Sequence, residues 1–163
     1  MPIAIAIASR LPDATFMVKT GDAAAPMSTA DVFKGKKVVL FAVPGAFTPT
    51  CHLKHLPGFL NNIDAFKTRG IDTIACTSVN DHHVMAAWGK ATGADGRILL
   101  LADGTAAFAK AMGLSAELGP LGTRSQRYAA YVDDGVLKIL NVEDAPGKAE
   151  ASSAEALLAQ LPA

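Results

Sequence analysis

The sequence predicts one α/β domain over residues 1–163, with a mixed central β-sheet flanked by helices. Short apolar runs rich in β-branched residues alternate with stretches whose apolar residues recur every three or four positions. Later in the chain, two more apolar runs are separated by Asp134-Gly135, a pair that favours a tight hairpin turn. Strands joined through helices are parallel and hairpin strands are antiparallel, so the combination indicates a mixed sheet.

Five apolar runs supply the predicted strands. The first is KVVLFAV at 37–43, followed by IDTIACTSV at 71–79 and RILLLA at 97–102. Their continuous apolar character is typical of strands buried on both faces. The hairpin strands are expected at 127–132 and 136–142. The opening MPIAIAIAS also alternates, which indicates a strand at the sheet edge or at an interface, and these two alternatives stay open.

Four helices are expected between and after these strands. The longest covers about 50–68, because Phe59, Ile63 and Phe66 share one face and Gly70 is a favourable residue to end it. A second helix begins with an Asn80 or Asp81 cap and runs to about Thr92. A third, short helix begins at Thr105 and closes at Gly113. The last helix begins at Ser152, which forms a capping-box pattern with Glu155. This order is similar to the thioredoxin-like architecture.

Composition excludes several classes of function. Lys plus Arg and Asp plus Glu are each 15, so the formal net charge is zero and no basic surface for nucleic acid or an anionic membrane is expected. No run approaches the roughly 20 apolar residues of a membrane span. The opening segment lacks the basic start and the apolar core of about 7–15 residues of a secretory signal. A soluble, cytoplasmic protein is therefore expected.

Cys51 is the predicted chemical centre. It lies in the stretch VPGAFTPTCHLKHLPGF, where a buried strand ends and a helix begins. An ordinary thiol is only about 3% thiolate at pH 7, and lowering its pKa to about 6 requires roughly 3.4 kcal/mol. A helix terminus typically supplies about 0.3–1 kcal/mol, so an arginine and a hydroxyl donor should assist. Thr48 is the nearest hydroxyl on the same loop.

The spacing Pro44-x-x-x-Thr48-x-x-Cys51 resembles the peroxiredoxin active-site motif, and the longer stretch resembles the type II (fifth-class, atypical) subfamily. The similarity continues through ACTSVNDHHVMAAWGK, LLADGTAAFAKAMGL and GTRSQRYAAYVDDG, in the family's order. It implies a thioredoxin-like fold and a thiol peroxidase that acts on hydrogen peroxide and organic hydroperoxides, in antioxidant defence and redox homeostasis. It implies no cofactor and no metal.

The resemblance also implies a role for four residues. Cys51 corresponds to the peroxidatic cysteine, which becomes a sulfenic acid. Thr48 corresponds to the hydroxyl that holds the peroxide, Pro44 to the residue that shields the site, and Arg127 to the active-site arginine. Arg124 is the alternative arginine, expected on the opposite face of the strand.

The late resolving cysteine of some subfamily members is absent, because the segment GKAEASSAEALL contains none. A one-cysteine cycle is therefore expected, with glutathione and glutaredoxin, or thioredoxin, as external reductant. Cys76 is interpreted as a buried strand residue, with a resolving role as the alternative. The resemblance also implies a homodimer, for which Phe47 and Leu121 are candidate apolar contacts.

Other hypotheses compete with the peroxidase. Cys51, His52 and His55 could belong to a metal site, although no C-x-x-C pair is present. His55 is expected instead to bond or pack near Cys51, and His52 to be exposed. Trp88 is interpreted as core, with a pocket or interface role as the alternative. A redox sensor with poor turnover, or a protein whose cysteines are buried and inert, would also fit.

Overall fold

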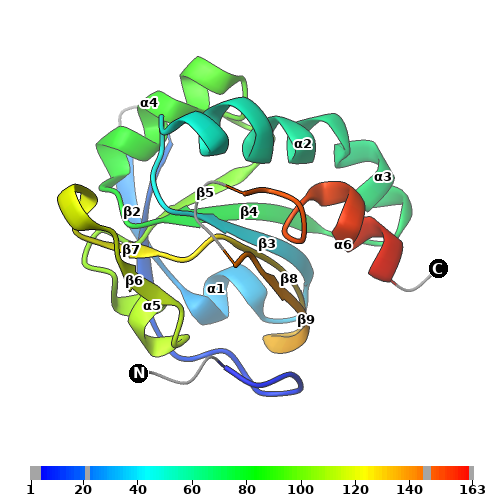
Figure 1. The fold of residues 1–163 in the computed structure, drawn as a ribbon. Helices are drawn as coiled ribbons and strands as arrows, with labels where there is room; N and C mark the ends of the chain where they lie inside the picture. Colours follow the sequence, from blue (N-terminus) through cyan, green and yellow to red (C-terminus); the bar gives the residue numbers. More distant parts are fainter. Residues whose placement is uncertain (1–4, 21–22, 145–147, 162–163) are drawn as a thin grey trace.

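The computed structural model describes residues 5–20, 23–144 and 148–161; the side chains of Thr20, Cys51 and Leu53 also lie outside the description. Its centre is a seven-stranded sheet in the order β2-β1-β5-β4-β3-β8-β9 (Figure 1). The strands are β1 (Thr15–Thr20), β2 (Ala23–Ser28), β3 (Lys37–Val43), β4 (Thr73–Ser78), β5 (Leu99–Ala102), β8 (Tyr128–Asp133) and β9 (Val136–Val142). The strands β3, β4 and β5 are parallel, and the remaining pairs are antiparallel. The predicted mixed sheet is confirmed.

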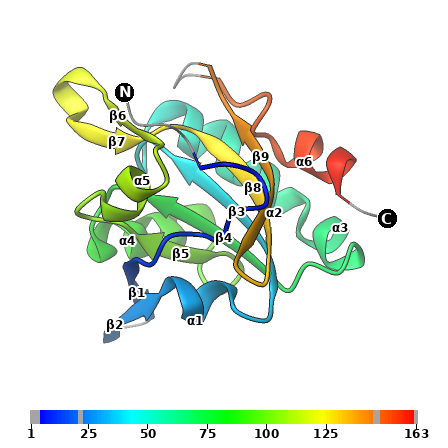
Figure 2. The same cartoon turned by 90° about the horizontal axis from the view of Figure 1, so that it is seen from below.

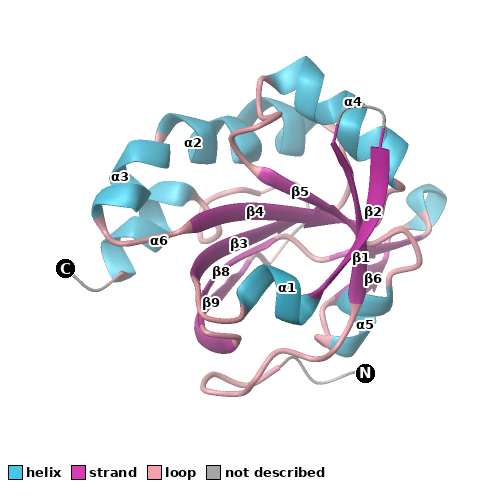
Figure 3. Cartoon of the chain, turned by 180° about the vertical axis from the view of Figure 1, so that it is seen from behind, coloured by secondary structure: helices cyan, strands magenta, loops and turns pink. Residues whose placement is uncertain are grey.

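Helices cover both faces of the sheet. One face carries α2 (Leu56–Asn61), α3 (Ile63–Thr68), α4 (His82–Thr92) and α6 (Ala154–Gln160), and the other carries α1 (Thr29–Phe33) and α5 (Ala107–Ala111) (Figures 2 and 3). A separate ribbon pairs β6 (Ser115–Glu117) with β7 (Thr123–Ser125), and the 3₁₀ turn η2 (Gly119–Leu121) joins them. This arrangement agrees with the thioredoxin-like sandwich expected from the sequence.

Strand alternation divides the core into two halves. On β3, Val39, Phe41 and Val43 pack under α2, α3, α4 and α6, while Val38, Leu40 and Ala42 face α1 and α5. Successive side chains of a strand point to opposite faces, so one central strand serves both halves. All six residues are fully buried, which explains the continuous apolar run in the sequence.

The predicted helix over 50–68 is not continuous. The π-helical turn η1 (Cys51–His55) precedes α2, and α3 follows after Asn62. Pro57 has no backbone N–H and therefore cannot make the i→i−4 bond of an α-helix at this point. At the second break, the side-chain amide of Asn62 donates to the Gly58 carbonyl oxygen at 2.7 Å, in place of the backbone. Gly70 does end α3, with φ of +84°, as predicted.

Two further expectations need correction. Ser153, rather than Ser152, caps α6, because its hydroxyl accepts from the Ala156 N–H at 3.1 Å. Residues 5–9 of the opening alternation contain no strand, although Arg10 bridges to Val136, and residues 1–4 lie outside the described part. Within the described ranges, no helix is long and apolar enough to cross a membrane.

Candidate active site

The loop after β3 folds back on itself before Cys51. The Thr48 hydroxyl donates to the Gly45 carbonyl oxygen at 2.7 Å, and the His52 N–H donates to the Thr48 carbonyl oxygen at 2.9 Å. The Ala46 N–H donates to the Asn80 side-chain oxygen at 3.0 Å, which ties the loop to the end of β4. The loop therefore has a defined path from the buried strand into the turn that begins with Cys51.

Cys51 is the first residue of η1, at the carboxyl end of β3. This edge of a parallel sheet is where ligands gather in open α/β folds. Single π turns within helical segments also occur frequently at functional sites. The side chain of Cys51 lies outside the described part of the chain, and the description of this residue is limited to its backbone position in η1.

His52 is half-buried, which corrects the expected exposed position. The indole N–H of Trp88 donates to its Nδ1 at 3.0 Å, and the Phe47 ring stacks on it at a centroid distance of 5.8 Å. Trp88 is fully buried, so its interpretation as core is confirmed. Its single polar atom nevertheless joins α4 to the residue after Cys51.

Arg127 is buried beside His55, with 2% of each residue exposed. Its Nη1 donates to His55 Nδ1 at 3.0 Å, and His55 Nε2 donates to the Ser152 carbonyl oxygen at 2.9 Å. The tautomer follows from these partners, because a carbonyl only accepts and a guanidinium only donates. Burial and the neighbouring Arg127 lower the pKa of His55 to about 3. His55 is therefore a neutral acceptor for the guanidinium.

Arg124 takes different partners from Arg127. Its Nη1 donates to the carbonyl oxygens of Val79 at 2.9 Å and of Pro44 at 3.5 Å, so it holds the loop backbone. Gly45 lies directly against it, since a Cβ there would come within 3.3 Å of Nη1 and 3.2 Å of Thr48 Cγ2. Arg124 thus braces the loop, while Arg127 contacts the helical turn of Cys51.

The geometry also bears on the metal hypothesis. His55 uses one ring nitrogen on Arg127 and the other on Ser152, which leaves no lone pair for a metal. His52 Nδ1 already accepts from Trp88. Among the described residues, no group of three or more His, Cys, Asp or Glu side chains could hold a metal ion.

Two residues near the site were missed by the sequence analysis. Glu143 is only 8% exposed, and its Oε2 accepts from the Ser152 N–H and hydroxyl, both at 2.7 Å. Ser152, expected as a helix cap, is fully buried and connects Glu143 to His55. The sequence offered one signal for Glu143, which is an acidic residue directly after the apolar run that forms β9.

Comparison with known proteins agrees with this architecture. The Redoxin family model matches residues 6–158. Peroxiredoxin-2E-2 of Oryza sativa is 45% identical over 96% of this chain and 72% of its own. Peroxiredoxin-2B of Arabidopsis thaliana is 41% identical over 96% of this chain and 98% of its own. The structure of reduced Prx3 of Vibrio vulnificus with hydrogen peroxide is 52% identical, with a TM-score of 0.90 over 96% of this chain and 95% of that one.

The names of related proteins correct the cytoplasmic location expected from the sequence. Peroxiredoxin-2E-2 and Arabidopsis Peroxiredoxin-2E are named chloroplastic, and Arabidopsis Peroxiredoxin-2F is named mitochondrial. These names contradict an assignment to the cytoplasm based on the lack of a visible signal. The type 2 names themselves agree with the type II resemblance, and the identity extends over nearly the whole chain. The chain therefore belongs to the redoxin family and, within it, to the peroxiredoxins, which are thiol-dependent peroxidases.

Proposed function

We propose that Cys51 is the peroxidatic cysteine of a single peroxiredoxin domain spanning 1–163, and that it reduces hydrogen peroxide and small organic hydroperoxides. The Cys51 thiolate attacks one peroxide oxygen, an S–O bond forms, and the O–O bond breaks. The other oxygen takes a proton and leaves as water or an alcohol, and Cys51 becomes a sulfenic acid. The related Prx3 of Vibrio vulnificus, whose structure contains hydrogen peroxide, supports this substrate.

The observation that carries the proposal is the buried Arg127 held by a neutral histidine. His55 accepts from Arg127 Nη1 without contributing a negative charge, so the guanidinium keeps its positive field. A buried cation close to the turn of Cys51 favours thiolate over thiol and opposes the negative charge that develops on the leaving oxygen. This is the assistance that the helix terminus alone does not supply.

Thr48 and Pro44 complete the proposed site. The Thr48 hydroxyl donates its proton to the Gly45 carbonyl, so its oxygen would accept from the O–H of a bound peroxide. Pro44 is buried and its carbonyl accepts from Arg124. The Pro44 ring would shield the Cys51 thiolate from bulk water, and the exclusion of water strengthens the electrostatic interactions of the site.

We infer that an external thiol reduces the sulfenic acid. Cys76 is fully buried within β4, and the segment before α6 contains Ser152 and Ser153 where a resolving cysteine would be needed. Glutathione with glutaredoxin, or thioredoxin, is the proposed reductant. A homodimer is the proposed assembly, in which the exposed Phe47 and Leu121 are buried.

Peroxide consumption with a small dithiol tests the proposal. Cys51→Ser should abolish turnover, because the hydroxyl is a far weaker nucleophile than a thiolate. Cys76→Ser, the matched control, should retain the wild-type rate. Full activity of Cys51→Ser would end the proposal, and a folded but inactive Cys76→Ser would replace the one-cysteine cycle by a two-cysteine cycle. A wild-type protein that is oxidised once but never turns over would favour the redox sensor.

A further inference from the structure

Four buried polar residues close a ring of hydrogen bonds behind the proposed site. Arg127 binds His55 through its side chain, and His55 binds the Ser152 carbonyl. Ser152 binds the Glu143 carboxylate, and the Glu143 N–H donates to the Arg127 carbonyl oxygen at 2.9 Å. The ring joins the residue before β8, the residue after β9, the end of η1 and the segment before α6, so it links His55 to residues more than 70 positions later in the chain.

We propose that Glu143 is a positioning residue for peroxide reduction: it fixes Ser152, and through the His55 ring it sets the direction of the Arg127 guanidinium. The inference rests on the proposed role of Arg127. It adds a residue that touches neither the peroxide nor Cys51 in the proposed mechanism.

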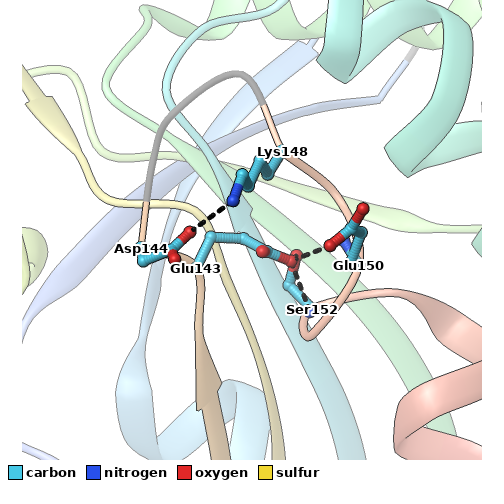
Figure 4. A network of polar contacts seen from close by, with 5 residues as sticks. All are labelled: Glu143, Asp144, Lys148, Glu150 and Ser152. Carbon is cyan, nitrogen blue, oxygen red and sulfur yellow. Dashed lines mark hydrogen bonds and ion pairs between the residues drawn. The ribbon is translucent and has the colours of Figure 1, made fainter.

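Glu143 suits this task because one carboxylate oxygen gathers several donors. Its Oε2 accepts from the backbone N–H groups of Glu150 and Ser152 and from the Ser152 hydroxyl, each at 2.7 Å (Figure 4). An ionised carboxylate has only acceptor sites, and bonds to it are shorter and stronger than neutral ones. A buried carboxylate is tolerated only when it is bonded in this way, so both the acid and the loop are held in one place.

The position of Ser152 determines that of Arg127. The Ser152 carbonyl is the acceptor that keeps the proton of His55 on Nε2 and therefore keeps Nδ1 open toward the guanidinium. If Ser152 moves, His55 can rotate or change tautomer, and Arg127 loses a fixed acceptor. Displacements of about 1 Å at a reacting centre can cost about 100-fold in rate.

The test is the single-turnover rate constant of the reduced enzyme with hydrogen peroxide. We expect Glu143→Ala to slow the reaction by about tenfold or more. Glu143→Gln should slow it less, since a neutral amide oxygen still accepts hydrogen bonds, though more weakly. Asp144→Ala is the matched control: it removes the adjacent carboxylate, which is exposed and pairs with Lys148 at 3.5 Å, and it should leave the rate unchanged.

A double-mutant cycle separates positioning from a general effect on the fold. If Glu143 acts through Arg127, Glu143→Ala should cause no further slowing once Arg127→Ala is present. An equal slowing in both backgrounds, or no slowing in a folded Glu143→Ala protein, would overturn the inference. If Glu143→Ala does not fold, the cycle is run with Glu143→Gln against Asp144→Asn, and the same two outcomes decide.

The cycle also distinguishes this inference from the proposed function. If Arg127→Ala alone leaves the rate unchanged, the role of Arg127 fails and the inference fails with it. If Arg127→Ala slows the reaction and Glu143→Ala does not, only the positioning role of Glu143 is wrong.

Discussion

His55 shows how burial can assign one protonation state to a side chain that titrates near neutrality in water. Its two hydrogen bonds require a proton on Nε2 and a lone pair on Nδ1, and burial removes the solvent that would stabilise the imidazolium. A protonated ring would also face the Arg127 cation. The same side chain therefore orients the proposed catalytic arginine without offsetting its charge.

This arrangement predicts a pH dependence of stability. The pKa of His55 is lowered to about 3 in the folded protein, whereas an unfolded histidine titrates near 6.5. Because the folded pKa is the lower one, the unfolded chain binds the proton first. The stabilisation is complete above about pH 6.5 and is lost as pH falls toward 3, by about 1.4 kcal/mol per pH unit within that window.

Urea unfolding of wild type and His55→Gln at pH 7 and pH 5 measures this contribution. Other groups titrate alike in both proteins, so the difference between the two free energies of unfolding isolates His55. We expect the advantage of wild type to shrink by about 2 kcal/mol between the two pH values. Parallel losses of stability in both proteins would show that His55 is not held neutral.

At the scale of elements, α4 depends on the N-cap residue that precedes it, Asp81. The Asp81 carboxylate accepts from the Val84 N–H at 2.9 Å and caps a helix that ends at Gly93, with φ of +78°. Asp81→Ala should lower the free energy of unfolding by about 1 kcal/mol, because it leaves a helix donor without a partner. Asp81→Asn retains a side-chain oxygen that can cap the helix, so it should change the free energy of unfolding only slightly. Thermal or urea unfolding of the two variants measures this difference, and an equal loss of stability in both would contradict the capping role of Asp81.

The elements also show what the sequence could predict. The strand at 37–43 is found with the same bounds because a fully buried strand needs a continuous apolar run, and the Asp134-Gly135 hairpin follows from local turn chemistry. β2 was missed because AAAPMS has little β propensity and includes a proline, which an edge strand tolerates. β6 and β7 have three residues each, too few for a periodic pattern.

At the scale of the whole molecule, the site combines segments that no local pattern relates. Thr48 and Cys51 share one loop and could be predicted together from their spacing. Ser152 contacts His55, and Glu143 contacts Ser152, only through the tertiary fold, because His55 lies 97 positions before Ser152 in the chain. Residues brought together in this way are invisible to periodicity and motif, which explains why the sequence analysis missed them.

Two exposed apolar side chains, Phe47 and Leu121, are the predicted contacts of the proposed homodimer. Phe47 is 49% exposed and Leu121 is 43% exposed, and Arg124 links their loops by donating to the Leu121 and Pro44 carbonyls. In the proposed dimer, Phe47→Asp or Leu121→Glu should shift the protein toward monomer, because a charge replaces buried apolar area. Ile7→Glu, at a residue 54% exposed outside this loop pair, should leave the assembly unchanged. Sedimentation velocity distinguishes these outcomes, and a shift with Ile7→Glu alone would place the interface elsewhere.

The hydrogen bond between Trp88 and His52 gives the protein an internal optical reporter. The chain contains one tryptophan, so its indole emission comes from a single position, fully buried and bonded to the residue next to Cys51. Any movement of η1 that breaks this bond would change the polarity and quenching around the indole. Fluorescence of the unlabelled protein can therefore follow, in real time, whether η1 moves during the oxidation and reduction proposed for Cys51.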